Sequence, residues 1–153
     1  MREARLAGRL TSAWAAAVFA FAVVPTHALL ARTVGEREAL TTQVGHFVEF
    51  AVLAWLATWW IDARRRAKGA AKGGSREAGR WAAAREAAGD YAIMLGALVL
   101  FGVLIEAAQS LLPYRSAQMR DAAIDAAGAL VGLLAALSCD LSRLGRRGRW
   151  RGR

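Results

Sequence analysis

The chain has 153 residues, of which 56% are hydrophobic, and it carries a formal net charge of +9. A soluble protein with so apolar a composition is seldom so basic, whereas a membrane protein combines both when its charges lie between apolar segments. The basic residues flank the apolar segments instead of forming one basic face, which argues against nucleic-acid binding. A single cysteine, Cys139, excludes an intramolecular disulfide and a cysteine-based zinc site.

Four apolar segments are each close to the ~20 residues that a helix needs to cross the hydrocarbon core of a bilayer. They cover roughly residues 11–30, 44–61, 91–112 and 122–141. No polar face recurs along them with the period of a helix, which argues against the helices of a soluble core. The sequence therefore predicts an all-α membrane protein with four transmembrane helices, in a single domain over residues 1–142 followed by a basic tail at 143–153.

The first segment has two interpretations. Arg2, Arg5 and Arg9 precede its apolar run, and residues 25–28 could pass for the cleavage region of a secretory signal peptide. We favour a retained span, because cleavage would leave three spans and place the C-terminus on the side opposite the N-terminal arginines.

The distribution of Lys and Arg predicts the orientation. Three precede the first segment, eight lie between the second and third, and six follow the fourth, while the other two connections hold two each. Cytoplasmic segments carry the positive excess, so both termini and the loop at 62–90 are predicted to be cytoplasmic. Trp14, Trp59, Trp60 and Tyr91 lie near the predicted inner ends, where aromatic belts occur.

Polar side chains gather near the predicted outer ends of the last three segments. At about 1.5 Å per residue, Glu49, Glu106 and Asp125 lie roughly 6 to 9 Å below the outer boundary. His46, Gln109 and Asp121 lie a turn nearer the surface, each three or four residues from a member of the first set and so on the same helix face. Ionisable groups at this depth are costly and commonly functional. The sequence thus predicts an outward-facing polar pocket that binds a ligand, without a cofactor or metal, through His46, Glu49, Glu106, Gln109, Arg115, Asp121 and Asp125.

The fourth segment is rich in small residues and contains the spacing Gly128-x-x-x-Gly132. Small residues let membrane helices approach closely. Packing within the chain is the favoured use of this spacing, and association into a homo-oligomer is the other.

Two groups of residues resemble the VanZ-like family of bacterial membrane proteins. The second segment opens with His46 and Glu49, and the ordered set that follows later in the chain is Glu106, Gln109, Pro113, Arg115, Asp121, Gly128 and Gly132. The resemblance implies a four-span protein of the bacterial cytoplasmic membrane, and the founding member is associated with low-level resistance to teicoplanin, a lipoglycopeptide. Three positions depart from the family pattern, which usually has Asn in place of Asp125 and often an Asp-Lys pair in place of residues 41–42.

These observations favour a cell-envelope protein whose pocket binds or masks a lipid-linked cell-wall precursor or a lipoglycopeptide. Arg115 would contact phosphate or carboxylate, for which its planar guanidinium is suited. The alternative is an enzyme that acts on a lipid headgroup through acid–base or metal chemistry at His46 and the carboxylates, although the chain has no HExxH or GxSxG motif. Ion translocation is disfavoured, because the polar groups stop in the outer half. A purely structural network that fixes helix register also stays open.

Overall fold

The computed structural model describes residues 1–23, 37–69, 78–113 and 118–149, with side chains described over 1–23, 43–68, 84–113 and 118–139. The described residues form four helices and no strand: α1 (Arg2–Val23), α3 (Arg37–Gly69), α4 (Ala78–Ser110) and α5 (Met119–Arg149). Each helix contains a stretch long and apolar enough to cross a membrane. The predicted all-α fold with four spanning helices is confirmed.

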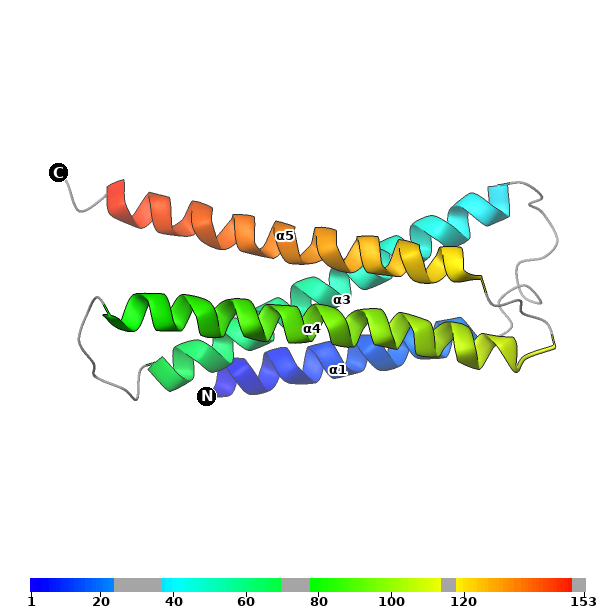
Figure 1. The fold of residues 1–153 in the computed structure, drawn as a ribbon, viewed down its shortest axis with the longest axis horizontal. Helices are drawn as coiled ribbons and strands as arrows, with labels where there is room; N and C mark the ends of the chain where they lie inside the picture. The colour runs from blue at the N-terminus through cyan, green and yellow to red at the C-terminus, as the bar shows by residue number, and fades with distance from the viewer. Residues whose placement is uncertain (24–36, 70–77, 114–117, 150–153) are drawn as a thin grey trace.

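The four helices lie along one long axis, with α3 crossing the bundle obliquely (Figure 1). The start of α1 and the end of α5 lie at one end of the bundle, together with the end of α3 and the start of α4. The opposite end holds the end of α1, the start of α3, the end of α4 and the start of α5. We call the first the terminal end and the second the polar end of the bundle.

Helix α3 is the centre of the bundle, and its most extensive contact is with α5. Two glycines permit this contact, because a Cβ atom on Gly128 would run into the backbone carbonyl of Phe47 and one on Gly132 into that of Ala51. The Gly128-x-x-x-Gly132 spacing is therefore used within the chain to bring two helix backbones together. Association of copies into an oligomer stays a prediction.

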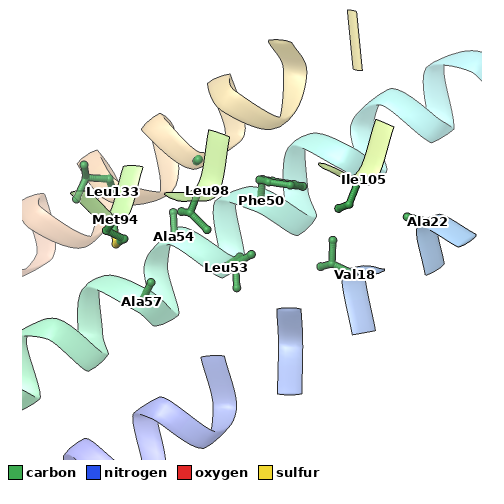
Figure 2. Close-up of a cluster of buried hydrophobic side chains, with 11 residues drawn as sticks. Val18, Ala22, Phe50, Leu53, Ala54, Ala57, Met94, Leu98, Ile105 and Leu133 are labelled. Atoms are coloured by element: carbon green, nitrogen blue, oxygen red, sulfur yellow. The ribbon is translucent and has the colours of Figure 1, made fainter. Parts of the chain in front are cut away.

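Apolar side chains from all four helices form one core around α3 (Figure 2). Phe50 and Leu53 of α3 are almost fully buried, and Ile105 of α4 and Val18 of α1 are buried against the same core. Only 17% to 33% of each spanning stretch is buried inside the protein. The remaining apolar surface, which includes Leu104 of α4, is exposed and suits contact with lipid tails.

The helices extend beyond the predicted spans. Residues 62–69 and 78–90, predicted as part of a loop, are helical, because their Ala, Arg and Lys residues favour helix whether or not they lie in a membrane. The first helix begins at Arg2 and ends at Val23, so it lies earlier in the chain than the predicted span at 11–30. Trp14 is half-buried against the core, and its place in an interfacial belt stays a prediction.

Candidate functional site

Six of the seven predicted site residues lie on three helices at the polar end. Helix α3 carries His46 and Glu49, helix α4 carries Glu106 and Gln109, and helix α5 carries Asp121 and Asp125. We call these six residues the polar cluster. The seventh, Arg115, lies outside the described residues.

His46 of α3 and Asp125 of α5 form a side-chain contact between the two helices. The His46 Nδ1 atom lies 3.1 Å from Asp125 Oδ1, with side-chain exposures of 11% and 0%. A hydrogen bond at this distance needs one proton between the two atoms, which either the imidazole Nδ1–H or a protonated Asp125 carboxyl group supplies, depending on the tautomer and protonation of the pair. The neighbouring Gly128 lies three residues along α5 and sets the close approach of the helices that the pair requires.

A glycine of α4 makes room for the buried carboxylate. A Cβ atom on Gly102 would lie 3.1 Å from Asp125 Oδ2 and 3.5 Å from Phe50. Gly102 precedes Glu106 by four residues and so lies on the same face of α4. The sequence analysis did not single out Gly102, although its position one turn from Glu106 was a signal that could have found it.

Glu106 and Gln109 connect α4 to its neighbours. Glu106 is 4% exposed, and its Oε2 atom accepts a hydrogen bond of 2.7 Å from the backbone N–H of Gln118, directly before α5. Gln109 donates through Nε2 to the backbone carbonyl of Ala22 at 3.1 Å. This carbonyl is in the last described turn of α1, and carbonyls in the last turn of a helix have no N–H donor within the helix. Both side chains therefore help to place helix ends, and nothing in the sequence pattern indicated the two backbone partners.

Two carboxylate oxygens of the cluster are buried and have no hydrogen-bond partner among the described residues. They are Glu106 Oε1 and Asp125 Oδ2. A buried polar atom that lacks a partner costs about 1 to 3 kcal/mol, more when it is charged. Native structures contain few such atoms, and each one calls for a physical explanation. These oxygens are acceptors available to a donor group, a cation or water.

The ionisable groups of the cluster are close enough to act on one another. Charges on Asp125, Asp121 and Glu49 influence His46, and those on Asp121, His46 and Asp125 influence Glu106. Among the described residues no Lys or Arg pairs with these carboxylates, and the nearby Arg120 instead donates to Gln43 Oε1 at 3.3 Å. The described part of the cluster thus holds four acids and one imidazole, a balance that attracts cationic or donor-rich groups.

The geometry of the cluster also bears on metal binding. The described residues contain no group of three or more His, Cys, Asp or Glu side chains placed to hold a metal ion. The closest approach to a ligand set is the His46–Asp125 pair, which offers one nitrogen and one oxygen.

Comparison with known proteins places this cluster in a family context. A family model described as VanZ/LLP1 matches residues 8–140, nearly the whole chain. The matched range includes all six residues of the polar cluster and Arg115. Neither the curated proteins nor the solved structures gave a match.

Proposed function

The chain belongs to the VanZ/LLP1 family, and on this premise we propose that it is a multi-pass protein of the bacterial cytoplasmic membrane whose polar cluster binds an envelope amphiphile. The ligand class is a lipid-linked cell-wall precursor or a lipoglycopeptide. Each of these has a donor-rich polar part joined to an apolar chain. The proposal gives the cluster a binding role and no catalytic step.

The observation that carries this proposal is a pair of buried oxygens, Glu106 Oε1 and Asp125 Oδ2, which have no hydrogen-bond partner among the described residues. Two such atoms on facing helices are unfavourable for folding alone. A ligand that brings hydroxyl, amide or ammonium donors would supply the missing hydrogen bonds. The apolar surface that surrounds the cluster on the outside of the bundle suits the lipid part of the same molecule.

The predicted orientation of the protein in the membrane places the polar cluster near the outer leaflet. The positive charge in the connections predicts that the terminal end is cytoplasmic, which makes the polar end the outer one. Cell-wall precursors are exposed to lipoglycopeptides on that side of the membrane. Arg115, which follows the end of α4 in sequence, would add a cation for the phosphate or carboxylate of the ligand.

The test is protection against teicoplanin in a sensitive, single-membrane host. Wild type, Glu106→Gln and the matched control Glu86→Gln, an exposed carboxylate on the same helix, are expressed to equal membrane abundance. The proposal expects protection with the wild type and the control and its loss with Glu106→Gln, and weaker or no protection against vancomycin. Equal protection by all three proteins would exclude the cluster as the site. A fall in the abundance of Glu106→Gln alone would instead support the structural network that fixes helix register.

A second function is favoured by one specific contact, the hydrogen bond between His46 and Asp125. A carboxylate that orients an imidazole is a common feature of acid–base catalysis. An enzyme of this kind would convert defined envelope lipids to products that mass spectrometry detects, and His46→Gln would abolish them. Metal analysis of the purified protein separates the metal-dependent version, which would require bound metal in the active preparation.

A further inference from the structure

The terminal end of the bundle has a groove of its own. It has a volume of about 490 Å³ and lies between the start of α1 and the end of α3. We call it the arginine groove, and its lining residues are Ala4, Arg5, Gly8, Arg9, Ser12, Trp60 and Arg64. The start of α1 and the end of α3 are at the opposite end of the bundle from the polar cluster, so the groove is separate from the proposed ligand site (Figure 1).

The three arginines of the groove have no acidic partner among the described residues. The nearby acids are engaged elsewhere: Glu3 accepts hydrogen bonds from Trp59 Nε1 at 3.1 Å and from Arg66 Nη2 at 3.0 Å. Farther along, Asp90 accepts from Arg65 at 3.0 Å and Asp62 from the Tyr91 hydroxyl at 2.6 Å. Three positive charges therefore converge on one groove with no described carboxylate to neutralise them, which favours an anion.

Gly8 lets the Trp60 ring pack closely against α1 in the wall of the groove. Gly8 has no side chain, and a Cβ atom there would lie 2.9 Å from Trp60 Nε1. The Arg64 guanidinium lies 4.9 Å from the centroid of the Trp60 ring, a cation–π contact that orients both groups. The Trp60 indole N–H has no acceptor among the described residues. The groove thus combines guanidinium groups, an indole donor and the Ser12 hydroxyl, which are donors that suit phosphate oxygens.

The position along the helices points to a lipid phosphate. Arg9 is followed at once by the apolar run of α1, and Arg64 comes three residues after Ile61, the last apolar residue of the predicted second span. The groove therefore lies where the predicted apolar segments of α1 and α3 end, a position that suits contact with lipid headgroups. Leu6 and Leu10, 53% and 43% exposed, lie on the same turns of α1 as the arginines and offer an apolar surface for acyl chains.

We propose that the arginine groove binds the phosphodiester headgroup of an anionic phospholipid from the leaflet at the terminal end. Basic pockets between membrane helices bind such headgroups, and each Lys or Arg near the surface adds about 1 kcal/mol of attraction. Guanidinium groups from both helices then hold one lipid between α1 and α3. This binding is independent of the ligand at the polar cluster.

The test is a titration of the full-length purified protein with phosphatidylglycerol and with zwitterionic phosphatidylcholine, followed by native mass spectrometry. The wild type is expected to prefer phosphatidylglycerol, and Arg5→Gln with Arg9→Gln should weaken that binding about tenfold or more. The matched control is Arg2→Gln with Arg85→Gln, which removes the same charge from exposed positions outside the groove. The control should bind as the wild type does.

Several outcomes would overturn the proposal. These are no preference for the anionic lipid, an equal loss in the control pair, or displacement of the lipid by an excess of inorganic phosphate, which would assign the groove to a free anion. Arg5→Lys with Arg9→Lys guards against misfolding, because it keeps the charge. Binding between that of the wild type and that of the Gln pair, with unchanged thermal unfolding, is the expected result for a site that uses the planar guanidinium.

Discussion

The two ends of the bundle differ in how far their charged side chains are buried and in how these side chains are paired. At the polar end, Asp125 and Glu106 are 0% and 4% exposed, and each has one described hydrogen bond and one oxygen without a partner. At the terminal end, Arg66 and Glu3 pair at 3.0 Å while 53% and 56% exposed. The loss of a partner is costly for the buried groups, whereas the exposed groups can form hydrogen bonds with bulk water instead. Substitutions should therefore have unequal effects at the two ends.

The largest effect is expected at Gly132, where the backbones of α3 and α5 are in close contact. Gly132→Leu would drive a side chain into the backbone of α3 at Ala51, separating α3 from α5. We expect a loss of stability of about 3 kcal/mol or more, at the upper end of the cost of overpacking. Unfolding of the purified protein in mixed micelles measures it.

The matched control is Gly96→Leu on α4, where an added Cβ atom meets nothing within 4 Å. This substitution should change stability by less than about 1 kcal/mol, since it also gains helix propensity. Equal losses of stability in the two variants would mean that the close contact between α3 and α5 at Gly132 does not stabilise the bundle.

A second prediction distinguishes the contribution of the Asp125 hydrogen bond to stability from the contribution of its charge. Asp125→Ala removes the partner of His46 and should cost about 2 kcal/mol of stability. Asp125→Asn keeps an acceptor for the imidazole and should cost less than about 1 kcal/mol. The same unfolding assay compares them. If Asp125→Asn is as damaging as Asp125→Ala, the carboxylate charge itself stabilises the bundle and the unpartnered oxygen needs a different explanation.

The helices and the residues that form the cluster could both be predicted from the sequence. Hydropathy identifies the four spanning stretches because lipid contact requires unbroken apolar composition. The spacing of His46 with Glu49, and of Asp121 with Asp125, placed each pair on one helix face, and the structure brings these faces together. The binding role of the cluster stays a prediction.

The register between helices could not be predicted in this way. Hydropathy reports which residues suit lipid, but not where a helix ends or how far it slides along its neighbour. The bond between Gln109 and the Ala22 carbonyl, and that between Trp14 and the Glu49 carbonyl at 3.0 Å, fix the position of α1. Both bonds use backbone acceptors, which every residue has, so no side-chain pattern predicts them.

A third prediction tests whether Gln109 acts through this register. Gln109→Leu leaves the Ala22 carbonyl without its partner and should cost about 1 kcal/mol of stability. Ser110→Ala is the control, since Ser110 is exposed and its one hydrogen bond among the described residues goes to Ala107 of its own helix. It should change stability by less than about 0.5 kcal/mol. Unchanged stability in Gln109→Leu, combined with lost protection against teicoplanin, would assign Gln109 to the ligand and not to helix placement.

The smallest effect is expected at the terminal end, for the pair Arg65 and Asp90. Its atoms are 3.0 Å apart, but the side chains are 23% and 43% exposed, so water and salt screen the attraction. A double-mutant cycle with Arg65→Gln and Asp90→Asn should give a coupling below about 1 kcal/mol. The coupling should fall further at high salt, because the Debye length shrinks. A coupling that is insensitive to salt and as large as the cost of Asp125→Ala would show that both ends hold their charges in the same way. The contrast between buried and exchangeable partners would then be lost.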